Sequence, residues 1–276
     1  FTEFLNYNPQ AADWYDRDRF ILSAGHGSML IYALLYLTGY PDITLDDLKN
    51  FRQLGAKTAG HPEHEMLAGI ETTTGPLGQG LANAVGMALS EKKLAAQFGR
   101  ELIDHYTYVI AGDGCLMEGI SQEAISFAGH YQLNKLIVLF DDNQISIDGA
   151  ISLTCSDDQL ARFKASNWRV EAIDGHDYTA IRAALKRAQN SQQPSLIACR
   201  TIIGYGSPNK AGCASSHGAP LGAEEAALTK AALGIDYEPF AIPQKLQQEW
   251  RQLAQKRTAK YQLWQQKFNQ QAKASS

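Results

Sequence analysis

An acid and an amide stand at the ends of two neighbouring apolar segments of the chain. Asp113 lies between two glycines directly after the apolar segment 106–111, and Asn143 follows the apolar segment 136–140 by way of two aspartates. Both segments are typical of buried β-strands, and the residues between them suit a helix that we expect Ser121 to cap. A strand, a helix and a second strand predict a parallel pair. Because ligands of open parallel sheets collect at the carboxyl ends of the strands, we expect Asp113 and Asn143 to meet at one edge.

These two side chains suit a hard cation. Mg²⁺ takes oxygen ligands, keeps some water, and is usually held by one or two protein groups together with substrate phosphates. Asp113 offers a carboxylate, Asn143 offers an amide oxygen, and the following loop, near Ile145, offers a main-chain carbonyl. The glycines beside Asp113 allow a tight turn and leave main-chain N–H groups open to a diphosphate. A plain strand-to-helix turn is the alternative for an isolated Gly-Asp-Gly, and the Asp-Asp-Asn at the next strand end favours the cation site.

Three histidines lie in loops among glycine or proline and are therefore poor candidates for filling a core. They are His26, His61 and His217. Imidazole can donate or accept a proton near neutral pH, which suits catalytic work, although a solvated side chain is the alternative for each ring taken alone. Zinc binding is rejected for the segment 61–65 (HPEHE), because Pro62 argues against the helix that a His-Glu metal face needs. His176, in the turn 174–177 (DGHD), is interpreted as structural.

A glycine-rich segment, residues 71–80 (ETTTGPLGQG), could be mistaken for a nucleotide motif. It has neither the G-x-G-x-x-G order of a dinucleotide-binding turn nor the Gly-Lys-Ser/Thr ending of a phosphate-binding loop. From the residues alone, its glycines either admit a ligand or only allow a helix to approach closely.

The remaining patterns alternate between helix and strand. Helices are expected over residues 28–37, 81–95 and 179–189, and a further strand over residues 195–203. This alternation predicts an α/β fold with a doubly wound, mainly parallel sheet and helices on both faces. Residues 204–222 hold five glycines and two prolines, which predicts a long loop of a kind that is often functional. From residue 242 onward, apolar residues recur at helical spacing and predict an amphipathic helix.

Composition excludes some partners. The 276 residues are 45% hydrophobic and carry a net charge of −4, from 25 basic and 29 acidic side chains. Because no basic block occurs, we expect no nucleic-acid partner. No apolar segment reaches the length of a membrane span, so we expect no membrane association. The four cysteines form no C-x-x-C pair and nothing indicates a signal peptide, which predicts a cytoplasmic protein.

Five segments together resemble the transketolases. Residues 112–149 resemble the thiamine diphosphate motif of that family, which opens with Gly-Asp-Gly and closes with Asn after one helix and one strand. The other segments occur in the family order and extend the resemblance over nearly the whole chain; they are residues 16–40, 48–63, 69–88 and 202–222.

The resemblance implies a thiamine-diphosphate- and Mg²⁺-dependent enzyme, in which Ca²⁺ or Mn²⁺ can substitute. It would transfer a two-carbon ketol unit from a ketose phosphate to an aldose phosphate in the pentose phosphate pathway. Asp113, Asn143 and the main-chain carbonyl of Ile145 would hold the metal. Two alternatives stay open: another thiamine-diphosphate ketol transferase, such as dihydroxyacetone synthase, and a non-catalytic cofactor-binding subunit.

The resemblance also implies roles for single residues around the cofactor. The catalytic side chains are implied to be His26, His61 and His217. They would line the channel above the thiazolium ring and bind the sugar oxygens, with His26 and His217 also contacting the cofactor. Further cofactor-binding positions are Gly75, Pro76 and Leu77 beside the aminopyrimidine, Gly114 at the diphosphate, Glu118 near a subunit interface, Asn143, and Ile147 and Ile203 beside the thiazolium. Core packing is the alternative for either isoleucine, and an exposed acid is the alternative for Glu118.

The implied domain organisation leaves the active site incomplete. Residues 1–235 would form the diphosphate- and Mg²⁺-binding domain, and residues 236–276 a helical extension leading toward a pyrimidine-binding domain. In the family that domain, usually from the partner subunit of a dimer, supplies the glutamate that activates the aminopyrimidine, and no segment of this chain matches it. We therefore expect the isolated chain to be inactive, whether it is a cut domain or the first subunit of a split enzyme.

Overall fold

Five apolar strands form one parallel sheet in the computed structural model of the chain, which describes residues 1–274 and the side chains of residues 1–271. The strands lie in the order β1, β2, β3, β7, β6, and each neighbouring pair is parallel. Their bounds are Arg19–Leu22 (β1), Thr107–Gly112 (β2), Leu136–Asp142 (β3), Arg169–Asp174 (β6) and Ser195–Arg200 (β7). A separate antiparallel pair follows β3 and consists of β4 (Ile145–Ser146) and β5 (Gly149–Ala150).

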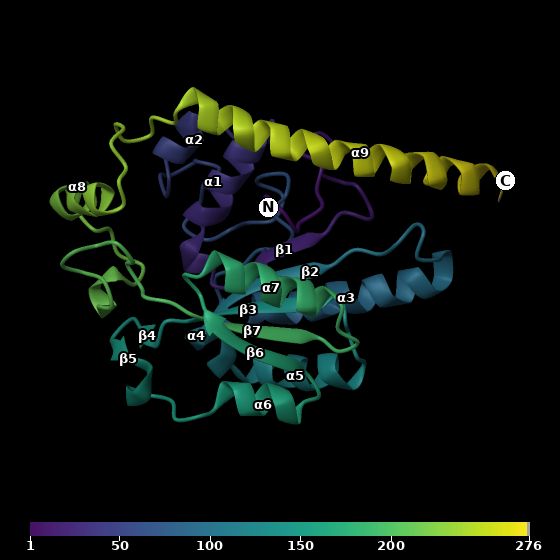
Figure 1. Ribbon diagram of the computed structural model, residues 1–276, viewed down its shortest axis with the longest axis horizontal. Coiled ribbons are helices and arrows are strands. Elements are labelled where there is room, and N and C mark those ends of the chain that lie inside the picture. Colours follow the sequence, from purple (N-terminus) through teal and green to yellow (C-terminus); the bar gives the residue numbers. More distant parts are fainter. Residues whose placement is uncertain (275–276) are drawn as a thin grey trace.

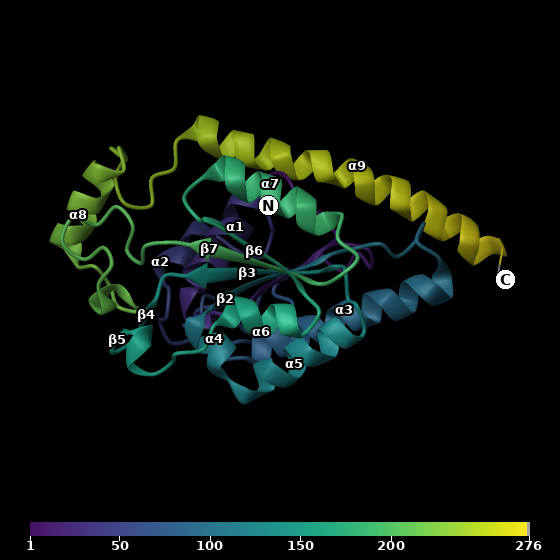
Figure 2. The ribbon, with the colours of Figure 1, turned by 60° about the horizontal axis from the view of Figure 1, so that its bottom comes forward.

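Helices cover both faces of the sheet (Figures 1 and 2). One face carries α3 (Gln79–Phe98), α4 (Asp113–Met117), α5 (Gly119–His130) and α6 (Gln159–Ala165). The other face carries α1 (Met29–Thr38), α2 (Leu45–Lys49), α7 (Tyr178–Gln189) and the long α9 (Gln244–Ala274). Helix α8 (Ala223–Ala232) lies apart from both layers. Three short 3-10 helices complete the described elements: η1 (Gly25–Gly27), η2 (Ile151–Leu153) and η3 (Ala214–Ser216).

Each face of the sheet has its own hydrophobic core. Alternate side chains of a strand point to opposite faces, so Val138 joins the core that includes α3 and α5, whereas its neighbour Ile137 joins the core beneath α1 and α7. Both side chains are fully buried. Parallel strands covered on two faces are expected to be continuously apolar, which is the pattern that residues 136–140 show.

The predicted fold class is confirmed. The helices expected over residues 28–37, 81–95 and 179–189 are present as α1, α3 and α7, with ends that differ by at most three residues. Helix α7 begins after Asp177, whose carboxylate accepts hydrogen bonds from the N–H groups of Thr179 and Ala180 at 2.8 and 3.2 Å. Within residues 1–274, no helix combines the length and the hydropathy that crossing a bilayer requires.

The predicted role of Ser121 as a helix cap is wrong. Helix α5 begins at Gly119 with Glu118 at its N-cap position, and no side chain caps it. Residues 113–117 form a helix of their own, and the Ser121 hydroxyl donates a 2.6 Å hydrogen bond to the carbonyl of Cys115 at that helix. Ser121 is fully buried and therefore fastens α5 to α4. Asp113 is thereby the first residue of a short helix.

The strand predicted over residues 195–203 is too long. Strand β7 ends at Arg200, because its neighbours β3 and β6 end opposite that residue, at Asp142 and Asp174. The apolar residues Ile202 and Ile203 continue the pattern of the strand without a partner strand, and the chain turns there. The expected loop 204–222 follows and contains η3.

The predicted C-terminal helix is present as α9, which begins two residues after the predicted start. Its buried Trp264 donates an indole N–H to the carbonyl of Leu102 at 2.8 Å, and Trp14 packs against the indole with ring centroids 6.1 Å apart. These contacts fix α9 along the domain (Figure 1). The boundary between residues 1–235 and 236–276 stays a prediction.

Two helical glycines provide a matched test of the packing between the helices. A Cβ at Gly129 of α5 would overlap the main-chain carbonyl oxygen of Ser166, whereas a Cβ at Gly86 of α3 would meet nothing within 4 Å. Gly129→Ala is expected to lower the free energy of unfolding by about 2 kcal/mol or more, because a close-packed interior resists overpacking. Gly86→Ala should raise it by up to about 1 kcal/mol through helix propensity. Urea unfolding measures both, and equal midpoints for the two variants would contradict this packing.

Candidate active site

Asp113 holds a buried carboxylate oxygen that no protein group satisfies. The residue follows β2 directly, and the register that pairs Gly112 with Asp141 brings it beside the end of β3. Its Oδ2 is buried without a hydrogen-bond partner. Burial, followed by the negative charges of Asp142 and Asp141, raises the pKa of Asp113 to about 6. A cation at this position would relieve both causes of the shift.

The side-chain amide of Asn143 is held in one orientation from both ends. Its Nδ2 donates to Asp141 Oδ2 at 3.0 Å, and its Oδ1 accepts the N–H of Ile145 at 2.9 Å. The hydroxyl of Thr201, just beyond β7, donates to the other oxygen of Asp141. Since an amide oxygen has two lone pairs, Oδ1 of Asn143 retains the capacity to bind a second group.

These residues fit a cation that shares its coordination with a phosphate ligand. Among the side chains of residues 1–271, no group of three or more His, Cys, Asp or Glu is arranged to hold a metal. One carboxylate oxygen without a partner and one oriented amide are nevertheless what Mg²⁺ needs when phosphate and water supply its other ligands. Asp113, Asn143 and the main chain at Ile145 could therefore hold a magnesium diphosphate.

Two of the predicted histidines stack on each other at the same edge. His26 lies in η1 after β1, His217 follows η3, and their ring centroids are 4.5 Å apart with the planes 20° from parallel. Burial is the main cause that lowers the pKa of each ring, and the nearby rings of His217 and His61 lower that of His26 further. Both rings are thus neutral at neutral pH. His217 Nδ1 is buried without a protein partner and is free to bind a ligand.

His61 lies against the glycine-rich segment. A Cβ at Gly75 would come within 3.0 Å of His61 Cγ, and a Cβ at Gly25 would come within 2.8 Å of the main-chain nitrogen of Gly75. Gly75 also has a φ of +135°, a conformation that side-chain-bearing residues rarely adopt. The structure therefore brings His61 and the segment at Gly75 up to the loop that carries His26.

The segment 75–77 also borders Gly114, the residue predicted to contact the diphosphate. Leu77 approaches Gly114, where an added Cβ would meet Leu77 Cδ1 at 3.1 Å. Pro76 and Leu77 are exposed, and so is Glu118. An interface role for Glu118 stays a prediction.

The two isoleucines that are predicted to lie beside the thiazolium are on separate segments. Ile147 connects β4 and β5 and is 73% exposed, whereas Ile203 follows β7 and is half-buried. Both segments leave the carboxyl edge of the sheet. Whether they flank one ligand stays a prediction.

The loop 204–222 is tied to α8 through a buried acid. The carboxylate of Glu225 accepts the main-chain and side-chain N–H groups of Asn209 at 2.8 and 2.9 Å, and also accepts the hydroxyl of Ser207. These bonds order the loop that brings His217 to the site.

The residues that orient the site are not recognisable from the sequence pattern. Asp141 belongs to the strand-end motif without a role of its own, and Thr201 lies within the predicted strand 195–203. Their roles depend on the pairing of β3 with β7, which joins residues that are 60 positions apart in the chain. A polar residue placed just past an apolar strand was the one available signal.

The fold and the site together define an α/β cofactor-binding domain that presents oxygen ligands and neutral imidazoles at the carboxyl edge of its sheet. A family model described as "Transketolase, thiamine diphosphate binding domain" matches residues 1–276. The chain belongs to the transketolase family and corresponds to this domain.

Relatives show how much of the family architecture the chain represents. It is 55% identical over 264 residues to a transketolase from Rhodobacter capsulatus, covering 96% of this chain and 39% of the relative. The crystal structure of transketolase from Campylobacter jejuni matches with a TM-score of 0.94 and 43% identity, over 97% of this chain and 42% of that one. A transketolase structure from Pichia stipitis, in complex with sedoheptulose 7-phosphate, matches with a TM-score of 0.91 and 43% identity, over 95% of this chain and 40% of that one. The chain thus spans about two fifths of these relatives.

Replacing Asp113 by asparagine is expected to raise the unfolding temperature of the metal-free chain at pH 7. The folded-state pKa of about 6 lies above the ordinary value of 3.8, so stability is lost as pH rises from 3.8 through 6 and Asp113 ionises. The gain from Asp113→Asn should therefore be largest at pH 7 and disappear near pH 4. Scanning calorimetry in the presence of a chelator measures this gain in unfolding temperature at each pH. Asp236→Asn, at an exposed position, is the control. An equal gain at both pH values would contradict the assigned cause.

Proposed function

We propose that this chain supplies the diphosphate- and Mg²⁺-binding half of a transketolase active site. The enzyme would transfer a two-carbon ketol unit from a ketose phosphate to an aldose phosphate, in the cytoplasm and within the pentose phosphate pathway. The observation that carries this proposal is the buried, unpartnered Oδ2 of Asp113 beside the oriented amide of Asn143. Family membership supports thiamine diphosphate as the ligand of that edge.

The residues of this chain would hold and orient the cofactor. Asp113, Asn143 and the carbonyl of Ile145 would hold Mg²⁺ together with the diphosphate, and Gly114 would leave room for the phosphates. Thiamine diphosphate, when bound, supplies a thiazolium ring that acts as an electron sink for carbon–carbon cleavage. The segment from Gly75 to Leu77 would contact the aminopyrimidine.

The histidines would handle the oxygen atoms of the sugar. Neutral His26 and His217 can each donate one hydrogen bond and accept another, and His61 adds a third imidazole to the same edge. Ile147 and Ile203 would exclude water beside the thiazolium. The Pichia stipitis relative in complex with a sugar phosphate supports phosphorylated sugars as substrates.

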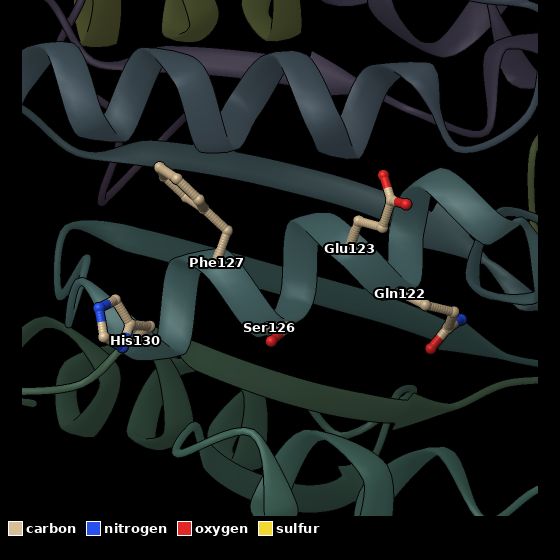
Figure 3. Close-up of a pocket in the computed structure, with 5 residues that line it drawn as sticks. All are labelled: Gln122, Glu123, Ser126, Phe127 and His130. Carbon is tan, nitrogen blue, oxygen red and sulfur yellow. The ribbon is translucent and has the colours of Figure 1, made fainter.

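Exposed aromatic residues on the outer face of α5 favour the proposal of a partner polypeptide. A shallow pocket on this face is lined by Gln122, Glu123, Ser126, Phe127 and His130 (Figure 3). Phe127 and Tyr131 are 40% and 46% exposed, and their ring centroids are 4.5 Å apart. Exposed aromatic residues that cluster on one face are typical of protein interfaces. We propose that the pyrimidine-binding domain of a second copy covers this face, with Glu118 at the border, and that residues 236–276 lead toward the corresponding domain of the same copy.

Cofactor binding tests the metal site directly. Titrating thiamine diphosphate into the chain with Mg²⁺ should release heat, and Asp113→Ala should weaken the affinity by at least about tenfold, the loss seen even when an outer partner of a metal ligand is removed. Asp236→Ala, which removes an exposed carboxylate elsewhere, should bind like the native chain. Equal heats from the native chain and Asp113→Ala would refute the metal assignment.

Partner dependence tests the division of the active site. The chain alone should not turn over, and adding a pyrimidine-binding domain should produce ketol transfer from a ketose phosphate. Phe127→Glu should reduce this activity by at least about tenfold, because a charge replaces an aromatic contact of the interface. Tyr178→Glu, at an 87% exposed position on α7, should leave it unchanged. Robust transfer by the chain alone would overturn the proposal.

A further inference from the structure

The turn between β6 and α7 is fixed on both sides. Asp174 Oδ1 accepts the N–H of His176 at 2.8 Å, and the N–H of Gly175 donates to the carbonyl of Arg200 at 2.8 Å. Gly175 lies so close to β7 that a Cβ there would come within 2.6 Å of Thr201 Cγ2. Asp177 caps α7 at the other end of the turn. The main chain of His176 therefore has one position relative to the end of β7.

The side chain of His176 reaches the segment that follows β7. Its Nε2 accepts the N–H of Ile202 at 3.1 Å, and its ring stacks on Tyr205 with centroids 4.1 Å apart and planes 25° from parallel. The ladder between β6 and β7 ends at the pair Asp174 and Arg200. Nε2 thus satisfies an N–H group that lies beyond the last paired residue, where β6 no longer offers a carbonyl.

The contacted segment is the one that leads to two proposed site residues. Ile203 directly follows Ile202, its carbonyl accepts the N–H of Gly212 at 2.8 Å, and the N–H of Tyr205 donates to the carbonyl of Ile202 at 3.2 Å. The same loop continues to His217, which stacks on the ring of His26. A shift of this segment would therefore move both Ile203 and the start of the loop that carries His217.

We propose that His176 and Tyr205 form a clamp that positions Ile203 and the loop of His217 for the cofactor. His176 is a positioning residue, because it acts through the N–H of Ile202 and the ring of Tyr205. The clamp follows from the contacts themselves, and its consequence for the cofactor rests on the proposed function.

The chemistry of the clamp suggests a conservative replacement. An Nε2 that accepts a hydrogen bond belongs to a neutral ring with its proton on Nδ1. Glutamine can place an amide oxygen near the position of Nε2 and keep the acceptor, although it loses the ring. Alanine removes both the hydrogen-bond acceptor and the ring. Comparing the two variants with the native chain therefore separates the loss of the hydrogen bond from the loss of the ring stack.

Amide hydrogen exchange tests the clamp without any cofactor. His176→Ala should raise the exchange rate of the Ile202 N–H by about threefold to tenfold, the range for losing one hydrogen bond, and His176→Gln should restore most of the protection. Tyr205→Ala should produce a smaller rise. Tyr178→Ala, which removes an 87% exposed ring two residues from His176, should change nothing. An unchanged Ile202 rate in His176→Ala would overturn the clamp.

Cofactor titration tests the positioning role. His176→Ala should weaken the affinity for thiamine diphosphate with Mg²⁺ by about threefold to tenfold, and His176→Gln should recover most of it. Faster exchange at Ile202 with unchanged affinity would overturn the positioning role. If His176→Ala does not fold, as judged by circular dichroism, Tyr205→Ala carries both measurements. Absence of binding by the native chain with its pyrimidine-binding domain present would overturn the proposed function and the positioning role with it, whereas the exchange rates would still decide the clamp.

Discussion

The site depends on a carboxylate that is buried beside two other carboxylates because three parallel strands end at one edge. The registers of β2 with β3 and of β3 with β7 bring Asp113, Asp141 and Thr201 together from distant parts of the chain. Asp141 is satisfied by Thr201 and Asn143, whereas one oxygen of Asp113 has no partner. The fold thus holds a negative charge where it costs stability without a cation, which is a common feature of binding sites.

The rest of the edge is built by close approaches of the main chain. Gly25 and Gly75 allow two loops to meet at distances that a side chain would prevent, and this contact brings His61 to the loop of His26. Glu225 orders the loop of His217 from the other side. Two imidazoles thereby stack in a partly buried environment that keeps them neutral, so they can exchange hydrogen bonds with a sugar.

Much of this could be predicted because it depends on local pattern. The apolar segments 106–111 and 136–140 predicted β2 and β3, and the strand-end position of Asp113 followed from the order of the elements. The prediction failed where local and tertiary preferences differ. Ser121 has the residue type of a helix cap, yet its hydroxyl bonds the preceding helix. Ile202 continues the apolar pattern of β7, yet no neighbouring strand extends far enough to pair with it.

By itself, the sequence determined the α/β class, the residue types available for metal and proton chemistry, and membership of the transketolase family, since periodicity and motif order are properties of the chain alone. Only the tertiary structure decided which polar atoms are satisfied. The unpartnered oxygen of Asp113, the oriented amide of Asn143 and the hydrogen bond from Ile202 to His176 each depend on registers and loop contacts between residues far apart in the chain. A hydrogen bond requires a specific distance and direction, and composition and spacing along the chain do not contain that information.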